Sequence, residues 1–149
     1  MDWNLREAVP ADVPRIGELY REMLGTIYGK PIEEPYEAGG FFGGEDRIFV
    51  AESAEGVVAF LSVQVHREER TYLYLDDFSV TAAWRGRGIG NAMLDEAEAY
   101  ARHLGISAVV LHVERSNAGA RRLYARRGYA LLEEQGDRLL LCRTEAHDA

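Results

Sequence analysis

Two adjacent carboxylates stand in the middle of a segment that otherwise has the composition of a β-strand. The segment 72–80 reads YLYLDDFSV, and its aromatic and aliphatic residues are typical of a pleated, half-buried backbone. Asp76 and Asp77 are poor strand formers and are costly to bury without a partner, so they break a local rule that their neighbours obey. A carboxylate placed there can take a proton from a reacting group. Because successive side chains of a strand point to opposite faces, at most one of the two faces a given substrate unless a bulge intervenes.

A glycine-rich segment follows this strand and leads directly into a helical pattern. Residues 85–90 read RGRGIG, and apolar residues at helical spacing begin at Ile89. Glycine lets backbone N–H groups come close to a ligand, and the start of a helix adds partial positive charge. The order of strand, glycine-rich turn and helix therefore predicts a site for an anion such as a pyrophosphate.

Two common nucleotide sites fit this turn poorly. A mononucleotide P-loop ends in Gly-Lys-Ser/Thr, which the segment does not contain. A dinucleotide site would begin at Gly86 and Gly88 and could use Glu114 as its ribose acid, but Asn91 stands where the third glycine belongs. Starting from Gly88 instead places Met93 in that position, and several strands precede the turn where a dinucleotide unit usually opens its domain.

The motif Arg85-x-x-Gly88-x-Gly90, after a strand ending in Val80, resembles the acetyl-CoA pyrophosphate loop of the GNAT superfamily of N-acetyltransferases. The run 113–129, VERSNAGARRLYARRGY, resembles the second signature of that family. The matching positions are Asn117, Ala120, Leu123, Tyr124, Gly128 and Tyr129. The order of elements and the length agree over nearly the whole chain, although Ala82 stands where the family often has proline.

The resemblance implies a mixed α/β fold of the GNAT-like acyl-CoA N-acyltransferase type. Its largely antiparallel central sheet would be splayed at the middle strands and flanked by helices. The pantetheine arm of the cofactor would lie between the parted strands like an added strand. Acetyl-CoA is the implied cosubstrate, and no metal is implied. The implied cofactor-binding residues are Phe78, Ser79, Val80, Arg85, Gly86, Arg87, Gly88, Ile89, Gly90, Asn91, Asn117, Tyr124 and Arg127.

The resemblance also implies direct attack of a neutral amine on the thioester in a ternary complex. The backbone N–H of Val80 would stabilise the oxyanion, and Tyr124 would protonate the departing thiolate. The central strand is similar to that of diamine (spermidine/spermine-type) acetyltransferases, in which the first acid lies on the substrate side. Asp76 is therefore the leading candidate for the base, and Asp77 would be a structural acid or a substrate contact. The alternative is that both acids only pair with arginines.

Three hypotheses for the function remain open at this point. A small cationic amine is the preferred acceptor, because acids occur in the central strand and in the irregular segment 26–46, which is either an acceptor-site loop or a plain mobile loop. The segment SNAGARRLY also resembles ribosomal-protein N-terminal acetyltransferases, so a peptide amine is the alternative acceptor. A non-catalytic sensor that holds acyl-CoA is the third hypothesis.

Composition limits the partners further. The chain has 149 residues and a net charge of -8, so we expect one domain over 1–149 and no nucleic-acid partner. No apolar run approaches the roughly 18 residues of a membrane span, so a membrane partner is not expected. Residues 1–5 show no signal-peptide pattern, so we expect a cytoplasmic location. The lone Cys142 is expected to be a buried thiol. The resemblance adds a homodimer as an expectation.

Periodicity, caps and turn residues predict the remaining elements. These are a strand 3–9, a helix capped by Asp12 and ending near Gly25, a hairpin 47–52 and 57–65, a helix from 89 to Gly105, a buried strand 106–113, a helix capped by Ser116 or Asn117 and ending at Gly128, a hairpin 129–133 and 138–142, and a frayed tail 144–149. His112 and Glu114 have a spacing that metal ligands use, but no second ligand cluster follows. His112 is therefore expected to be a packed or partly exposed histidine.

Overall fold

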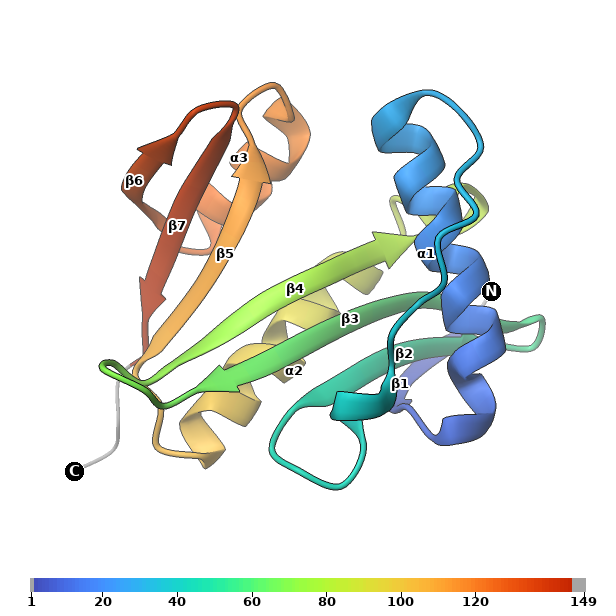
Figure 1. Ribbon diagram of the computed structural model, residues 1–149, viewed down its shortest axis with the longest axis horizontal. Helices are drawn as coiled ribbons and strands as arrows, with labels where there is room; N and C mark the ends of the chain where they lie inside the picture. Colours follow the sequence, from blue (N-terminus) through green and yellow to red (C-terminus); the bar gives the residue numbers. More distant parts are fainter. Residues whose placement is uncertain (1, 146–149) are drawn as a thin grey trace. The chain divides into compact units, whose positions relative to one another are not determined.

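The computed structural model describes residues 2–145, and the chain divides into two compact units. The first unit comprises Met1–Gln64 and Asp77–Glu96, and the second comprises Val65–Asp76 and Ala97–Ala149. The two strands β3 (Gly56–His66) and β4 (Tyr72–Val80) and the helix α2 (Ile89–His103) contribute residues to both units, and each is a continuous ribbon in Figure 1. The expectation of one domain over 1–149 stays a prediction.

Antiparallel strands form the sheet of the first unit. β1 (Trp3–Glu7) pairs with β2 (Arg47–Ser53), and β2 pairs with β3 (Gly56–His66) around a short turn. The predicted hairpin is therefore confirmed. β4 (Tyr72–Val80) follows β3 in the strand order, and its second half belongs to this unit. The structure thus confirms that several strands precede the glycine-rich turn.

The first helix is longer than predicted. A short 3-10 turn, Pro10–Asp12, leads into α1 (Val13–Tyr28), which ends at Gly29 and not at Gly25. Gly29 adopts the left-handed conformation, with φ 69°, and its N–H donates to the carbonyl of Gly25 at 2.9 Å, which is the usual glycine ending of a helix. The side chain of Asp12 makes no cap bond to α1, because it pairs with Arg6 at 2.8 Å and accepts from the N–H of Val9.

Part of the irregular segment 26–46 is held in the core of the first unit. Its first three residues complete α1, and Gly39–Phe41 forms a 3-10 turn. The ring of Tyr36 packs edge-on against Tyr20 at 5.1 Å between centroids and against Phe60 at 5.6 Å. Phe41 is buried in the same cluster. This part of the segment is therefore anchored by aromatic packing, and its role beside an acceptor stays a prediction.

The sheet of the second unit has the order β4-β5-β7-β6. β4 and β5 (Ala108–Glu114) are parallel, whereas β5 pairs with β7 (Arg138–Thr144) and β7 with β6 (Ala130–Gln135) in antiparallel fashion. The predicted mixed α/β class with a largely antiparallel sheet is confirmed. The β4/β5 ladder covers only Leu73 to Leu75 on β4, although that strand continues to Val80.

Two helices follow the glycine-rich turn at the predicted places. α2 (Ile89–His103) begins in the first unit and ends in the second, and α3 (Ala118–Arg126) belongs to the second. Of the two cap candidates for α3, the structure selects Asn117. Its side-chain oxygen accepts a hydrogen bond from the N–H of Ala120 at 3.1 Å.

A buried carboxylate ties α2 to the end of α3 and to the closing hairpin. Glu98 is 2% exposed and accepts hydrogen bonds from Arg127 at 2.6 Å and from the hydroxyl of Tyr129 at 2.8 Å, while Arg143 lies 3.2 Å away. Burial and the neighbouring Glu98 raise the pKa of Tyr129 far above its ordinary value, so this phenol remains a donor. The network positions α3 in the second unit.

The frayed tail was predicted to begin too early. Thr144 is the last residue of β7, and Glu145 is buried, with Arg102 at 3.3 Å and Arg143 at 3.2 Å. Two arginines therefore hold Glu145 in place, although the sequence predicted that this residue belongs to a frayed tail. The rest of the predicted tail, residues 146–149, lies outside the described residues.

Candidate active site

The turn between β4 and α2 is held in place by contacts within the protein. Trp84 is buried, and its indole N–H donates to Glu55 at 3.1 Å. The Nε of Arg85 donates to the carbonyl of Val80 at 2.9 Å, and the guanidinium of Arg87 lies 4.8 Å from the centroid of the Trp84 ring. These contacts fix the path of the chain through the turn.

Two glycines in this turn adopt a conformation that other residues rarely take. Gly86 has φ 75° and Gly88 has φ 84°, both in the left-handed region. The N–H of Ala92 makes the first helical bond, to the carbonyl of Gly88 at 3.1 Å. The N–H groups of Ile89 and Gly90, at the start of α2, come before this bond and therefore have no partner inside the helix. Arg85 and Arg87 are exposed beside them, so the turn is suited to an anion, and its assignment as the pyrophosphate site stays a prediction.

The predicted cofactor-binding residues of this region differ in what their side chains can offer. Ile89 is 1% exposed and anchors the start of α2 in the core, so only its backbone N–H is available to a ligand. Ser79 is also buried, whereas Phe78 and Val80 are half-buried. The carbonyl of Val80 is used by Arg85, and the assignment of its N–H to the oxyanion stays a prediction.

Asp76 and Asp77 occupy adjacent positions on β4, so their side chains point to opposite faces. Asp76 lies on the face that also carries Tyr72 and Tyr74, whereas the N–H of Asp77 donates to the buried hydroxyl of Ser62 at 3.0 Å. Partial desolvation by the surrounding protein raises the pKa of Asp76, although the charges of Arg138 and His66 act in the opposite direction. Asp76 is therefore a better proton acceptor than an ordinary aspartate.

Tyr124 is the general acid predicted from the second signature, and its surroundings in the structure keep its hydroxyl protonated. It lies on α3 with its ring edge-on to Tyr129 at 5.6 Å. Burial raises the pKa of its hydroxyl to about 12, so the phenol is protonated throughout the neutral range. A donor of this kind suits the protonation of a leaving thiolate.

Two other predicted cofactor residues in the second unit already have structural partners. The side-chain oxygen of Asn117 caps α3, and the guanidinium of Arg127, only 15% exposed, is paired with Glu98. The Asn117 cap was one of the two predicted from the sequence, whereas the Arg127–Glu98 pair was not expected. The assignment of both residues to the cofactor stays a prediction.

Residues 13–129 match the family model described as the Acetyltransferase (GNAT) family. The chain belongs to the GNAT acetyltransferase family. The resemblance inferred from the two motifs is therefore confirmed at the level of the family, and so is the GNAT fold.

Known proteins of this family differ in what they act on. Streptothricin acetyltransferase from Streptomyces lavendulae is 34% identical to this chain over 129 residues, which are 85% of the chain and 62% of that relative. The chain thus spans about 62% of the length of this curated relative. A particular closeness to diamine acetyltransferases is not shown.

Solved structures of the family share the fold at low sequence identity. The PaiA N-acetyltransferase from Thermoplasma acidophilum, in complex with coenzyme A, has a TM-score of 0.79 and 16% identity, and the match covers 97% of this chain and 100% of that one. The NatC complex bound to Gag peptide and CoA has a TM-score of 0.80 and 16% identity, with 98% and 100% covered. Both likenesses support the GNAT fold, and neither selects an acceptor.

Sequence reasoning missed a hydrogen-bonded chain on the Asp76 face of the GNAT sheet. The hydroxyl of Tyr74 lies 2.6 Å from Nδ1 of His112, and Nε2 of His112 lies 2.8 Å from Oε1 of Gln135. The sequence predicted only that His112 would be packed or partly exposed, and it is half-exposed. The strand register that joins the three residues could not be read from any one segment. Within residues 2–145, no cluster of His, Cys, Asp and Glu is suited to a metal ion, and no helix is long and apolar enough to cross a membrane.

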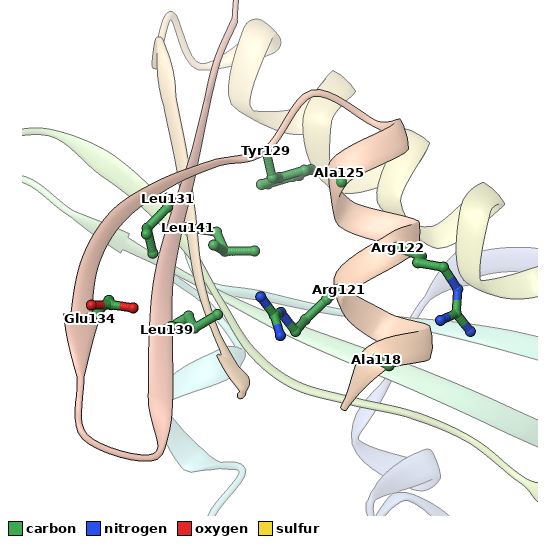
Figure 2. A pocket seen from close by; sticks show the side chains of 9 residues that line it. All are labelled: Ala118, Arg121, Arg122, Ala125, Tyr129, Leu131, Glu134, Leu139 and Leu141. Carbon is green, nitrogen blue, oxygen red and sulfur yellow. The ribbon is translucent and has the colours of Figure 1, made fainter. Parts of the chain in front are cut away.

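A hollow of about 390 Å³ lies between α3 and the β6/β7 hairpin (Figure 2). Leu131, Leu139, Leu141 and Tyr129 line its apolar side, and Figure 2 shows the side chain of Arg121 extending from α3 toward the strands. None of the predicted site residues lines this hollow. Arg121 donates to the carbonyl of Arg115 at 3.1 Å, which accounts for its position.

Proposed function

We propose that this GNAT protein transfers the acetyl group of acetyl-CoA to a primary amine of a small cationic molecule. The observation that carries the proposal is the turn 85–90, in which two left-handed glycines lead into the start of α2. This turn lies within the segment that matches the family model. The residues present fit the diphosphate of coenzyme A, because they combine the backbone N–H groups of Ile89 and Gly90, the polarity of the helix start and two exposed arginines.

The acceptor is assigned from the Asp76 face of β4. Asp76 is exposed and has Tyr72 and Tyr74 on the same side of the strand. A carboxylate among aromatic rings suits an alkylammonium group, which gains from charge pairing and from the ring faces. The curated relative is named for a small-molecule acceptor, streptothricin, which supports the same class. Asp77 remains a structural acid or a secondary contact.

The proposed reaction has three requirements, and each has a candidate in this chain. An alkylammonium with a pKa of about 10 must lose a proton before its nitrogen attacks, and Asp76 is the leading carboxylate for that step. The tetrahedral oxyanion would be stabilised by the N–H of Val80. The thiolate of coenzyme A would then be protonated by Tyr124, whose pKa of about 12 keeps its proton in place until it is needed.

Two other functions remain as alternatives, and two measurements separate them from the proposal. Release of free thiol from acetyl-CoA is measured with spermidine, an aminoglycoside, streptothricin and short peptides with free N-termini. The proposal predicts turnover with at least one small polyamine-type compound and a kcat/KM at least about tenfold higher than with any peptide. Faster turnover of the peptides would make the protein an N-terminal acetyltransferase. Coenzyme A binding by calorimetry without thiol release would indicate a sensor.

A further inference from the structure

We propose that Glu98 is a positioning residue for the acetyl transfer, because it holds the hydroxyl of Tyr124 in the place from which that hydroxyl protonates the leaving thiolate. This inference rests on the proposed function, in which Tyr124 is the proton donor. Glu98 lies on α2 and Tyr124 on α3, and both belong to the second unit. Glu98 acts through Arg127 and Tyr129, the residues that follow α3.

The carboxylate of Glu98 binds the two residues on either side of Gly128. Its Oε1 accepts from the guanidinium of Arg127 at 2.6 Å, and its Oε2 accepts from the hydroxyl of Tyr129 at 2.8 Å. Hydrogen bonds to a charged group are strong, and burial away from water strengthens them further. Each of the two side chains is therefore held in one position relative to α2.

The same two residues hold the backbone of Tyr124. The carbonyl of Tyr124 accepts from the N–H of Arg127 at 3.1 Å and from the N–H of Tyr129 at 3.0 Å. Gly128 lies between these donors with φ 86°, the left-handed conformation that commonly ends a helix. Glu98 thus reaches the backbone of Tyr124 along two paths, and each path consists of one side-chain bond and one backbone bond.

The ring of Tyr124 is held through Tyr129 as well. The two rings pack edge-on, with 5.6 Å between centroids and 65° between planes. Tyr129 is buried, and Glu98 binds its hydroxyl, so its ring is a fixed surface for the ring of Tyr124. A proton donor works only within hydrogen-bond reach of the atom that it protonates, so a small displacement of Tyr124 should lower kcat.

Arg143 on β7 closes the cluster from the other side. One of its guanidinium nitrogens lies 3.2 Å from Oε1 of Glu98 and donates to the carbonyl of Arg127 at 2.8 Å. The negative charge of Glu98 therefore lies between two guanidinium groups, and removal of that charge should disturb both of them. In this inference the side chain of Arg127 fixes the end of α3 and does not bind the cofactor.

The first test measures kcat, both KM values and the dissociation constant of coenzyme A. Glu98→Gln should lower kcat about tenfold, because the hydroxyl of Tyr124 is no longer held in place. Tyr129→Phe should lower kcat about threefold, since it removes one hydroxyl and keeps the ring. The KM values and the dissociation constant should stay within about twofold, because positioning of a proton donor acts on the chemical step. Loss of affinity with unchanged kcat would overturn the inference. Tyr129→Phe provides the test if Glu98→Gln does not fold.

A double variant separates positioning from a general loss of structure. In the Tyr124→Phe background there is no hydroxyl left to position, so Glu98→Gln should cause no further loss of kcat. A purely structural role would lower kcat by the same factor in both backgrounds. That result would overturn the inference.

Glu145→Gln is the matched control, because Glu145 is a second buried carboxylate that pairs with Arg143. Its other partner is Arg102 on α2, so its ion pairs do not include the two residues that hold Tyr124. Both glutamine variants should lower the melting temperature, but Glu145→Gln should keep the wild-type kcat. Equal losses of kcat in the two variants would contradict the assignment.

The nuclear Overhauser contact between the rings of Tyr124 and Tyr129 gives a check without substrate. It should be present in wild type and in Glu145→Gln and weaker in Glu98→Gln. Equal contacts in all three proteins would overturn the inference.

Arg127→Gln separates the two roles that this residue could have. Positioning predicts a lower kcat with an unchanged dissociation constant for coenzyme A. An increase of about tenfold in that constant, with unchanged kcat, would place Arg127 at the cofactor and contradict the inference.

Failure of the inference is distinguishable from failure of the proposed function. If wild type binds coenzyme A and releases thiol but Glu98→Gln and Tyr129→Phe keep the wild-type kcat, only the role of Glu98 is overturned. If wild type releases no thiol with any amine, the acetyl transfer itself is overturned, and the role of Glu98 with it.

Discussion

The turn 85–90 and the Asp76 face of β4 differ in where their chemistry comes from. In the turn, the partial positive charge comes from backbone N–H groups, which do not titrate. The left-handed conformations of Gly86 and Gly88 hold the backbone of the turn in place. On the β4 face the active groups are ionisable side chains, of which Asp76 has a raised pKa. We therefore expect changes in the turn to alter cofactor affinity at every pH. Changes in the second unit should alter kcat, the KM for the amine or the pH dependence of the reaction.

The largest effect is expected for Tyr124→Phe. Loss of the hydroxyl removes the proton donor to the thiolate, so kcat should fall by about 100-fold or more. Because the pKa of Tyr124 is about 12, wild type should keep its activity up to about pH 10, where an ordinary tyrosine would already be half ionised. Measured affinity for coenzyme A should stay within twofold, and Tyr28→Phe, an exposed tyrosine at the end of α1, is the control. A loss confined to cofactor affinity would contradict the distinction between the two regions.

Gly88→Ala should have the next largest effect, and on binding alone. No atom lies within 4 Å of the added Cβ, so the cost comes from the backbone at φ 84°, about 1–2 kcal/mol. If the turn relaxes, the N–H groups at the start of α2 no longer point at the diphosphate. The dissociation constant for coenzyme A should then rise about tenfold. Gly56→Ala is the matched control, because Gly56 has φ 101° and similar space in the β2/β3 turn. Both variants should lose similar thermal stability, and equal cofactor affinity in both would show that the turn does not bind the diphosphate.

The same contrast explains how far the sequence could predict the structure. The glycine-rich turn and the Asn117 cap depend on neighbouring residues, so the local sequence was sufficient to find them. The Tyr74–His112–Gln135 chain depends on the register of separate strands, β4, β5 and β6, which no local pattern encodes. The burial of Glu98 by Arg127 was missed for the same reason: its partner lies 29 residues away.

The end of α1 shows a different limit. Gly25 and Gly29 are both glycine, and the sequence offered no way to choose between them as the end of the helix. The helix continues because Gly25 tolerates helical geometry and Gly29 alone takes the left-handed conformation, with φ 69°. Aromatic packing of Tyr36 likewise could not be read from a segment whose prolines and glycines indicate only irregular structure.

Asp76→Asn should have a smaller effect, and its form separates the two roles that this residue could have. If Asp76 holds the ammonium, the KM for the amine should rise about fivefold with little change in kcat, the scale of one partly exposed ion pair. If kcat falls instead, and falls most at low pH, Asp76 is the proton acceptor of the proposed reaction. Asp137→Asn, in the β6/β7 turn, is the control.

The stability of the same variant gives an independent check on the raised pKa of Asp76. A raised pKa means that the folded state binds the proton more tightly than the unfolded state, so the free energy of unfolding falls as the pH rises through that pKa. Removing the carboxylate should therefore raise the melting temperature slightly at pH 7 and leave it unchanged at pH 3. A lower melting temperature at pH 7 would mean that Asp76 is stabilised as an anion.

The smallest effect is expected for Arg87→Ala, which tests how much of the turn's affinity comes from side-chain charge. Arg87 is exposed and lies over the ring of Trp84, so its charge is screened by solvent. The dissociation constant for coenzyme A should rise about threefold at low salt, and the difference from wild type should shrink by about half near 0.5 M salt. Arg70→Ala removes one exposed arginine before β4 and should leave the constant unchanged at both salt concentrations. A tenfold loss of affinity for coenzyme A that persists at high salt would mean that the Arg87 side chain, and not the backbone, binds the diphosphate. The contrast between a fixed backbone turn and a strand face with ionisable side chains would then no longer hold.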